Sequence, residues 1–467
     1  MDYDQAQEYL SRSLTFGIKL GLHRMKRLME LLHHPEQGPA YIHIAGTNGK
    51  GSVTTYCAAI LASTGRRVGV YTSPYLLRQT ERIRVIEGVK GLAGLAVDEE
   101  TGEITRDEFA AAFSKVKEAV DVMLAEGYEQ PTEFELITAV GFLHFTARAC
   151  DVVVLETGLG GRLDSTNVVE HPLACVITAL GYDHMERLGG TLRAIAAEKA
   201  GIIKNGCPVF LYRPQDLELP DGDAAEAETV IRNTCLERNA PLQIVGRGDI
   251  VYGDYGWNGQ SFTDQVSQLT LHTRLLGVVQ PMNATLAVRV CRTLGLADDD
   301  QIRAGIAAAR WPARLELLRR EPPVLLDGAH NPQCCQALAA SLNRLLPGRP
   351  VVFLAGVLQD KDYREMLNIL LKNASYKPAA FICVTPDSNR ALPAGQLADE
   401  IRRLAGQLPS APCTGYNGLN QILAAETPAA GARMALEIAD RQHIALCAFG
   451  SLYMVGSIRS ILAGREA

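Results

Sequence analysis

The chain has 467 residues, of which 47% are hydrophobic and 21% are charged, enough to build the cores of two or three domains. This composition excludes a wholly disordered protein. The 46 Lys and Arg residues are outnumbered by 52 Asp and Glu residues, so there is no positive surplus to follow a nucleic-acid backbone and no nucleic-acid partner is expected.

Cysteine usage and the N-terminus favour a cytoplasmic location. The eleven cysteines are scattered without a C-x-x-C pair, which is typical of reduced thiols. The first residues are acidic and polar, unlike the basic and then apolar start of a signal peptide. Because no apolar run approaches the ~20 residues that span a bilayer, the sequence predicts no membrane partner.

The first strong signal is a glycine-rich loop between a strand and a helix. Residues 41–45 form a short apolar run, and a helical pattern extends from 52 to about 63. In the intervening GTNGKGS, glycines let backbone amides approach phosphate oxygens, and Lys50 adds a positive charge for the β and γ phosphates. The sequence therefore predicts an ATP-binding loop. The alternative is a turn without a ligand, because an extra glycine separates the lysine from the serine.

Strands and helices then alternate along the chain. Further β-branched runs lie at 67–71, 151–155, 173–177 and 208–211. This alternation predicts a mostly parallel sheet covered on both faces. Residues 85–105 are expected to form a surface excursion, with a turn between two short polar strands. Alternating polar and apolar residues at 241–275 predict a small antiparallel sheet appended to this domain.

A second series of strands and helices begins near Arg314. Its strands are expected at 323–327, 350–355, 379–384 and 443–449, and its helices near 332–346, 361–372 and 394–405. Pro312 ends the preceding helical run, which places the boundary at residues 310–312. The predicted α/β protein thus has a P-loop ATPase-type domain at 1–309 and a smaller, Rossmann-like domain at 313–467.

Polar residues follow several of the predicted strands. Glu156 ends the run at 152–155, and Ser73 follows the strand that begins at residue 67. Ligands bind at the carboxyl ends of parallel strands, and oxygen ligands suit magnesium. A salt-bridging or capping glutamate and a turn serine are the alternatives. The glycine-dense turn at 157–167 is expected to lie close to the same ligand.

Three more residues are candidates whose default interpretations are structural. His184 follows the strand at 173–177, although a lone histidine is usually structural. Lys199 would by default be a solvated lysine on a helix. Asp327 ends a strand and is followed by a small turn and a helix with a proline near its start. An aspartate or asparagine that caps this helix is the alternative there.

Taken together, these segments resemble the Mur ligase superfamily, and most closely its folylpolyglutamate synthases, including the bifunctional forms that also act as dihydrofolate synthases. The matching segments run in the same order from residue 14 to beyond 450: HIAGTNGKGS, TSPYL, ERI, LETGLGGRLDSTN, YDHMERLGGTLRAIAAEKAGIIK, QPMNATLA, WPARLELL and LLDGAHNP. The combination is far more specific than the glycine loop, which every relative in the superfamily shares.

The resemblance implies roles for particular residues. The implied ATP contacts are Asn48, Gly49, Lys50, Gly51, Ser52, Asn283, Arg314 and Asp327. Two Mg²⁺ ions are implied, one near Ser73 and Glu156 and the other near His184. Lys199 is expected to be carbamylated, which would make it a metal ligand. The implied catalytic residues are Lys50, Lys199, His184 and His330, and the folate side is implied at Thr132, Phe134 and Arg162.

The implied reaction is an ATP-dependent ligation. The γ-phosphoryl group of ATP activates the γ-carboxylate of a folate as an acyl phosphate, which the amine of L-glutamate then attacks. Tetrahydrofolate polyglutamates are the expected acceptors, with dihydropteroate as a further candidate, and a monomer is the default assembly. Positioning and electrostatic neutralisation are expected to supply most of the catalysis.

Two alternatives remain open. A cell-wall Mur ligase would add an amino acid to a UDP-muramoyl precursor, but only 45 residues precede Gly46, too few for the separate nucleotide-sugar domain of those enzymes. A regulator that binds ATP without catalysis is the other alternative. The presence of Lys50, Glu156, His184 and Lys199 together argues against it.

Overall fold

The computed structural model describes residues 1–13, 17, 19, 21–372, 374–407 and 421–464, so that residue 14, where the resemblance begins, and Cys413 lie outside the described residues. The chain divides into two compact units. Unit 1 comprises Met1–Tyr252, Phe262–His272 and Pro281–Arg310, and unit 2 comprises Gly253–Ser261, Thr273–Gln280 and Trp311–Ala467.

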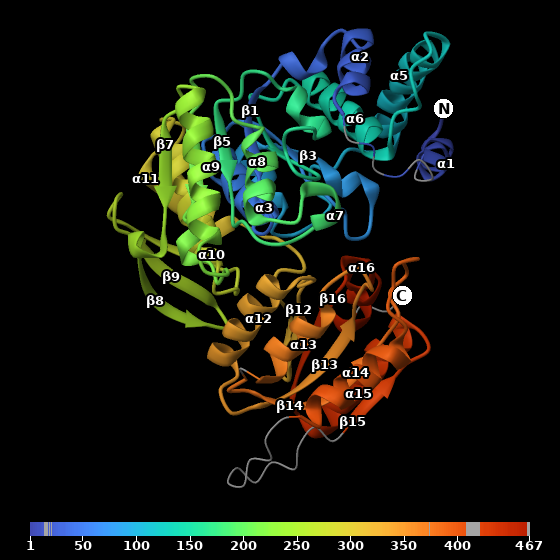
Figure 1. The fold of residues 1–467 in the computed structure, drawn as a ribbon, viewed down its shortest axis with the longest axis vertical. Coiled ribbons are helices and arrows are strands. Elements are labelled where there is room, and N and C mark those ends of the chain that lie inside the picture. The colour runs from blue at the N-terminus through green and yellow to red at the C-terminus, as the bar shows by residue number, and fades with distance from the viewer. Residues whose placement is uncertain (14–16, 18, 20, 373, 408–420, 465–467) are drawn as a thin grey trace. The chain divides into compact units, whose positions relative to one another are not determined.

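The core of unit 1 is a seven-stranded sheet with the order β3-β2-β4-β1-β5-β6-β7 (Figure 1). Its strands are β1 (Ala40–Ala45), β2 (Arg67–Tyr71), β3 (Ile83–Glu87), β4 (Val152–Glu156), β5 (Ala174–Ile177), β6 (Val209–Tyr212) and β7 (Leu242–Val245). All neighbours run parallel except the edge strand β3, which is antiparallel to β2. The predicted mostly parallel sheet is confirmed.

Helices cover both faces of this sheet. They are α1 (Tyr3–Ser13), α2 (His23–Leu31), α3 (Lys50–Ser63), α4 (Gly88–Gly94), α5 (Arg106–Ala125), α6 (Glu133–Ala147), α7 (Met185–Leu188), α8 (Leu192–Ala200), α9 (Asp223–Glu237), α10 (Gln280–Thr293) and α11 (Asp299–Ala308). One face packs against α5 and α6 and, further along, against α8 and α9. Successive strand residues point to opposite faces, and α3 packs against β2 and β4 on the other face, with α11 beside it.

Three local expectations need correction. The helix after the glycine loop begins at Lys50, two residues earlier than expected, so the lysine belongs to its first turn. Strand β7 joins the main sheet beside β6 and is not part of the small sheet. The segment after β3 forms the helix α4, and an isolated bridge between Arg84 and Glu103 takes the place of the expected pair of polar strands.

The small sheet contains three strands, β8 (Ile250–Gly256), β9 (Gly259–Asp264) and β10 (Leu269–Thr273), in the order β10-β9-β8. Strand β10 alternates buried and exposed residues, as expected for a sheet with one solvated face. The ion pair between Arg289 and Asp264 attaches β9 to α10. The predicted small antiparallel sheet is therefore present, over a shorter range than 241–275.

Unit 2 contains a six-stranded sheet with the order β11-β12-β16-β13-β14-β15. Its strands are β11 (Glu316–Arg320), β12 (Pro323–Leu326), β13 (Pro350–Gly356), β14 (Lys377–Cys383), β15 (Gln421–Ala424) and β16 (Ala445–Gly450). Among these described strands, only the pair of β11 and β12 is antiparallel. The sequence did not predict β11 or β15, which are short and partly exposed.

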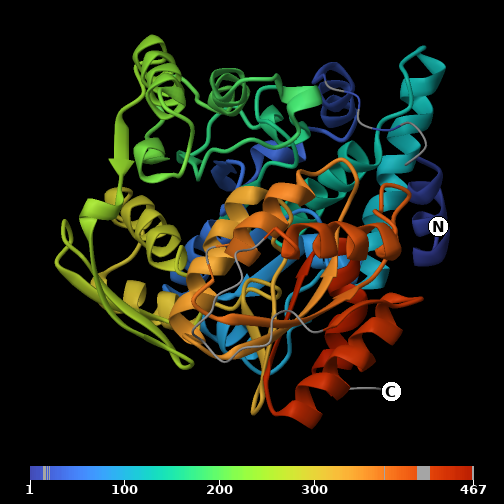
Figure 2. The same ribbon diagram turned by 60° about the horizontal axis from the view of Figure 1, so that its bottom comes forward.

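Helices flank both faces of the second sheet as well, and they are orange to red in Figure 2. They are α12 (Pro332–Leu345), α13 (Tyr363–Lys372), α14 (Ala394–Ala405), α15 (Pro428–Gln442) and α16 (Leu452–Leu462). Apolar residues of α12, α13 and α14 pack on Phe353, Phe381 and Phe449. Helices α15 and α16 pack against the opposite face. The predicted α/β architecture of this unit is confirmed.

Candidate functional site

The glycine loop leads from β1 directly into α3. Gly49 has φ +87°, a left-handed conformation that favours glycine, and a Cβ there would lie 2.9 Å from Asn283 Oδ1. A Cβ on Gly46 would lie 1.8 Å from Thr178 Oγ1. Both positions therefore require glycine. The first turn of α3, which holds Lys50 and Ser52, carries the backbone amides that have no partner within a helix and suit an anion.

Lys50 and Glu156 lie side by side because their strands are neighbours. In the parallel pair of β1 and β4, Ile44 is in register with Glu156, which brings the end of β4 to the start of the loop. Lys50 Nζ donates to the carbonyl oxygens of Gly46 and Thr47 at 3.2 and 3.3 Å. It also lies 4.0 Å from Glu156 Oε1, and the carboxylate is 5% exposed.

Lys199 reaches the same loop from α8. Its Nζ donates a hydrogen bond to the carbonyl oxygen of Gly46 over 2.8 Å, and the residue is buried. Burial, together with the charge of Lys50, lowers the pKa of the Lys199 amine to about 7. The interpretation of Lys199 as a solvated helix lysine is therefore wrong.

His184 and Ser73 lie at the same, carboxyl edge of the sheet. His184 has φ +52° and directly precedes α7, and its backbone amide donates to Asp183 Oδ1 over 2.8 Å. Its side chain is 43% exposed, whereas that of Asp183 is 11% exposed. The charge of Asp183 acts on the Lys199 amine, so Asp183 is a site residue that the sequence reasoning missed. Ser73 lies two residues beyond β2, next to the end of β4.

A buried hydrogen-bond network holds the glycine-dense turn that follows Glu156. Asp164 accepts hydrogen bonds from the amides of Leu159 and Thr166, at 2.8 and 3.0 Å. The Thr166 hydroxyl is also 2.8 Å from Nε2 of His43, a fully buried residue of β1. Burial raises the pKa of Asp164 and lowers that of His43 to about 3. Neither residue was predicted as a site residue.

The three residues expected on the folate side occupy one region but make different contacts. Thr132 caps α6 and exchanges hydrogen bonds with Glu135. The ring of Phe134 lies against the turn, where a Cβ on Gly158 would approach Phe134 Cζ to 2.4 Å. Arg162 is 57% exposed and pairs with Glu198 of α8 over 2.8 Å. Phe134 thus packs against the start of this turn, whereas Arg162 is part of the turn and contacts α8.

In unit 2, Asp327 follows β12 and is half-buried beside Arg314. Its Oδ2 accepts the amide of Leu315 over 2.6 Å. Burial raises the pKa of Asp327, and the neighbouring Arg314 opposes that rise. His330 Nδ1 is 2.9 Å from the carbonyl oxygen of Gly328.

Two residues that the sequence reasoning missed accompany His330. Lys361 and Ser451 line the same small cavity, Lys361 from the segment between β13 and α13 and Ser451 from the end of β16. Only Ser451 directly follows a strand, so the rule that identified Glu156 could have found Ser451 but not Lys361. Asn331, the next residue after His330, caps α12 by accepting the amide of Cys334 over 2.9 Å. His330, Lys361 and Ser451 therefore lie around one small cavity, where the Ser451 hydroxyl also accepts the amide of Tyr453 over 3.3 Å.

The donor set in unit 1 fits a nucleotide and a hard cation. The Glu156 carboxylate and the Ser52 and Ser73 hydroxyls supply oxygen, which magnesium prefers, beside a loop that accepts phosphate. Across the described part of the chain, no three His, Cys, Asp or Glu side chains gather as a metal site by themselves. A metal here would therefore also need phosphate, serine or lysine-derived oxygens.

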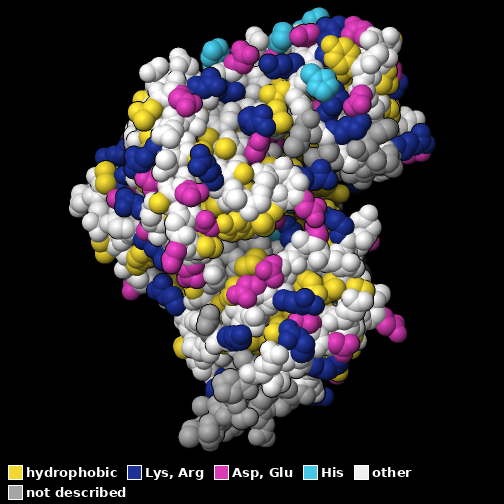
Figure 3. All heavy atoms as spheres, in the orientation of Figure 1, with side chains coloured by type: hydrophobic (Ala, Val, Ile, Leu, Met, Phe, Trp, Pro, Cys, Tyr) yellow, Lys and Arg dark blue, Asp and Glu magenta, His cyan; other side chains and the backbone are white. Residues whose placement is uncertain are grey.

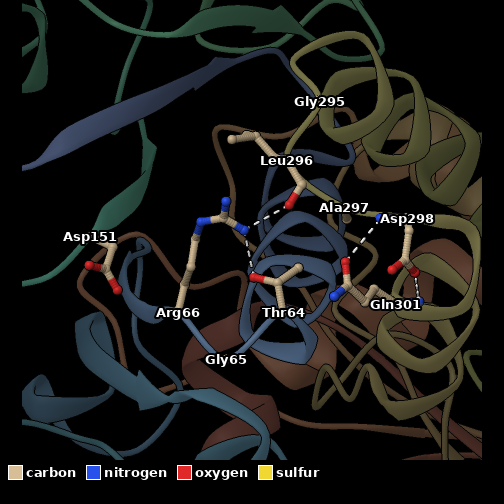
Figure 4. A pocket seen from close by; sticks show the side chains of 9 residues that line it. All are labelled: Thr64, Gly65, Arg66, Asp151, Gly295, Leu296, Ala297, Asp298 and Gln301. Carbon is tan, nitrogen blue, oxygen red and sulfur yellow. Dashed lines mark hydrogen bonds between the residues drawn. The ribbon is translucent and has the colours of Figure 1, made fainter.

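A cavity of about 700 Å³ lies elsewhere in unit 1 (Figure 4). It is lined where α3 ends, where β4 begins and where α10 leads into α11, by Thr64, Gly65, Arg66, Asp151, Gly295, Leu296, Ala297, Asp298 and Gln301. Arg66 donates to Thr64 Oγ1 and to the carbonyl oxygen of Leu296, at 2.6 and 2.7 Å. Asp151 and Glu156 stand at opposite ends of β4, so this cavity is separate from the glycine loop.

Two parts of the chain match the domains of Mur ligases. The model of the Mur ligase middle domain matches residues 104–291, and that of the Mur ligase glutamate ligase domain matches residues 313–451. Together with the strand, glycine loop and helix of unit 1, these matches define a Mur-type ligase.

Curated relatives narrow the class to one family. A dihydrofolate synthase/folylpolyglutamate synthase of Bacillus subtilis (strain 168) is 38% identical over 79% of this chain and 82% of its own length. A folylpolyglutamate synthase of Lacticaseibacillus casei is 33% identical over the full length of both chains. The chain belongs to the folylpolyglutamate synthase and dihydrofolate synthase family.

Solved structures agree with this assignment. A Mycobacterium tuberculosis folylpolyglutamate synthase complexed with ADP and AMPPCP has a TM-score of 0.81 and 26% identity, covering 99% of this chain and 98% of its own. A bifunctional folylpolyglutamate synthase/dihydrofolate synthase with Mn, AMPPNP and L-glutamate bound has a TM-score of 0.74 and 28% identity, covering 99% and 98%. The predicted resemblance is confirmed.

The surface charge and the lengths of the helices are relevant to binding of nucleic acids and membranes. On the face of each unit that Figure 3 shows, basic and acidic side chains are interspersed. This mixture matches the near balance of charges in the sequence. Within the described residues, every helix is too short or too polar to cross a bilayer.

Proposed function

We propose that this chain is an ATP-dependent ligase that joins L-glutamate to the γ-carboxylate of tetrahydrofolate polyglutamates through an acyl phosphate. Dihydropteroate is proposed as a second acceptor, because several relatives carry both enzyme names. The observation that carries the proposal is the cluster at the glycine loop. There two lysines share the Gly46 carbonyl, and one of them lies 4.0 Å from the Glu156 carboxylate.

The proposed ATP site begins with the loop. The Asn48 side chain, the amides of Gly49 and Gly51 and the Ser52 amide and hydroxyl would hold the phosphates, with Lys50 placing its charge beside them. Asn283 would complete this contact from α10, where its side chain already adjoins Gly49. From unit 2, we propose that Arg314 and Asp327 contact the same nucleotide, as the family resemblance implies.

The proposed metal ligands are oxygen donors with one imidazole. We propose one magnesium site at Ser73 and Glu156 and a second at His184 and Lys199. Magnesium bound there would neutralise charge on the phosphoryl group in transfer. The bound Mn and AMPPNP of a similar structure support a divalent metal together with a nucleotide.

The surroundings of Lys199 support the proposal that it is carbamylated. An amine with a pKa of about 7 is half neutral near neutral pH, and the neutral amine is the form that adds CO₂. The resulting carbamate keeps one N–H for the Gly46 carbonyl and provides two oxygens for a metal. Burial disfavours an ammonium beside Lys50, whereas the carbamate would bring a compensating negative charge.

The acceptor and the incoming amino acid have separate proposed positions. Thr132, Phe134 and Arg162 would border the folate, with the Phe134 ring providing an apolar face. His330 would stand near the incoming glutamate or the acyl phosphate, with Lys361 supplying a cation for a carboxylate. After the amine attacks the acyl carbon, phosphate leaves and the amide remains.

A side-by-side assay tests the proposal. Purified protein is given Mg·ATP and radiolabelled L-glutamate with tetrahydrofolate, dihydropteroate or a UDP-muramoyl precursor, and labelled product and ADP are measured. We expect glutamate incorporation with tetrahydrofolate and ADP release that depends on the acceptor. Product from the UDP-muramoyl precursor alone would support a cell-wall ligase. ATP binding without ADP release under all conditions would support a regulator.

Assembly and location belong to the same proposal. We propose a monomer that acts in the cytoplasm on small molecules, without nucleic acid or membrane as partners. The described cysteines are all free thiols, which supports a reducing compartment. Light scattering of the purified chain tests the monomer, because a dimer would double the measured mass.

A further inference from the structure

The glycine loop is fastened to the segment that follows β5. Thr178, the first residue after β5, is fully buried, and its hydroxyl donates to the carbonyl oxygen of Asn48 over 2.8 Å. The amides of Thr47 and Asn48 both donate to the carbonyl oxygen of Ala179, at 2.9 and 3.1 Å. These contacts hold the loop against the segment that follows β5, in addition to its covalent continuation into α3.

Thr47 adds a second hydroxyl to this attachment. Its Oγ1 donates to the carbonyl oxygen of Gly181 over 3.0 Å and accepts the amide of Gly181 over 3.1 Å. A hydroxyl both donates and accepts, so one side chain satisfies two backbone groups. We call Thr47, Asn48, Thr178, Ala179 and Gly181 the loop latch.

The latch determines which loop groups remain for a ligand. Because Ala179 takes the amides of Thr47 and Asn48, the amides available to an anion are those from Gly49 into the first turn of α3. Thr178 also closes the space beneath Gly46, whose carbonyl oxygen accepts hydrogen bonds from Lys50 and Lys199. A shift of the latch would therefore displace the acceptor that both lysines share.

The loop latch is also close in sequence to His184, one of the proposed metal ligands. Only Tyr182 and Asp183 separate Gly181 from His184, and Asp183 accepts the His184 amide over 2.8 Å. The position of the glycine loop and that of the His184 segment are consequently linked through Thr47.

We propose that Thr178 and Thr47 are positioning residues that hold the glycine loop in its nucleotide-binding conformation and in register with His184. The proposal rests on the proposed function only in naming ATP as the ligand. Neither side chain is assigned a contact with ATP; each acts through backbone groups of the loop.

The experiment uses the full chain and measures binding directly. Isothermal titration with Mg·AMPPNP is performed on the wild type, Thr178→Val and Thr178→Ser. Thr54→Val is the matched control, because Thr54 is equally buried on α3 and its hydroxyl has no hydrogen-bond partner among the described residues. KM values for ATP and for tetrahydrofolate are measured alongside.

We expect Thr178→Val to weaken nucleotide binding about three- to tenfold, as the loss of one hydrogen bond predicts. The KM for ATP should rise in parallel while the KM for tetrahydrofolate stays unchanged, and Thr178→Ser should restore both values. Wild-type affinity in Thr178→Val would overturn the proposal. So would an equal loss in Thr54→Val, because that result would indicate a general packing defect.

Thr47 keeps the test decisive if Thr178→Val fails to fold. Thr47 is only partly buried, so Thr47→Val and Thr47→Ser then carry the same comparison, with the same loss and rescue expected. Unchanged binding in Thr47→Val would overturn the proposal in that case. A wild-type protein that binds Mg·AMPPNP but ligates no glutamate would refute the proposed function alone, and the titrations would still decide the latch.

Discussion

The Nζ of Lys199 lies 2.8 Å from the carbonyl oxygen of Gly46, the residue that opens the glycine loop. The same oxygen accepts a hydrogen bond from Lys50 over 3.2 Å. Two lysines from different helices therefore meet on one backbone group, and the structure thereby links the proposed phosphate site to the proposed carbamate.

Removal of the Lys50 charge should abolish turnover. We expect Lys50→Ala to lower kcat/KM by about a hundredfold or more, because a preorganised charge at the transferring phosphoryl group is lost. Lys90→Ala is the control, since Lys90 is exposed on α4. Labelled glutamate incorporation measures both variants, and near-normal rates in Lys50→Ala would refute the assignment of the loop.

The carbamate should depend on pH. With a folded pKa of about 7, the neutral fraction of the Lys199 amine rises from about a tenth at pH 6 to about nine tenths at pH 8. We expect carbamate occupancy to rise across this window when dissolved CO₂ is held constant. Carbon NMR with labelled bicarbonate measures it, and an occupancy that stays near zero throughout would exclude the modification.

Lys199→Ala should also reduce activity more than Lys204→Ala. Both lysines have pKa values lowered by burial, but Lys204 Nζ contacts the carbonyl oxygen of Asn167 at 3.3 Å and not the glycine loop. The pair therefore separates a role at the loop from the general effect of deleting a buried lysine. Equal losses in glutamate incorporation would contradict the special role of Lys199.

Lys361 should affect glutamate more than ATP. We expect Lys361→Ala to raise the KM for L-glutamate about tenfold, as loss of a charge-assisted hydrogen bond predicts, with a smaller change in the KM for ATP. Lys377→Ala is the control. Lys377 is the first residue of β14, so it lies at the amino end of the strand, whereas the site lies beyond the carboxyl ends of the strands. A larger effect on ATP than on glutamate would argue against this position for the amino acid.

His43 should make the stability of unit 1 sensitive to acid. Its folded pKa of about 3 lies below the unfolded value of 6.5, so the unfolded state binds more protons between these values and stability falls as the pH drops through this window. Between pH 7 and pH 5 the loss from His43 is about 2 kcal/mol.

The variant His43→Gln isolates that contribution. Glutamine does not titrate and can still form a hydrogen bond with the Thr166 hydroxyl. The free energy of unfolding of His43→Gln, measured with urea, should therefore fall by about 2 kcal/mol less than that of the wild type over the same pH step. Identical pH dependence in the two proteins would show that His43 titrates normally in the folded state.

The sequence by itself determined the alternation of strands and helices, the glycine loop and the acid at the end of β4. These are local patterns, because a run of β-branched residues or a glycine before a helix constrains the backbone within a few residues. The antiparallel edge strand β3 and the membership of β7 in the main sheet were missed. The partner and the direction of a strand depend on how the sheet assembles, and a local sequence pattern does not specify them.

Only the tertiary structure decided how the candidate side chains are used. Lys199 lies on a short helix whose sequence suggests solvent, yet packing of α8 against the loop buries its amine and lowers its pKa. Thr132 and Arg162 were expected to face the folate. In the structure Thr132 caps α6, and Arg162 pairs with Glu198. Burial and the charges of neighbours decide the state of a side chain, and both come from residues far away in sequence.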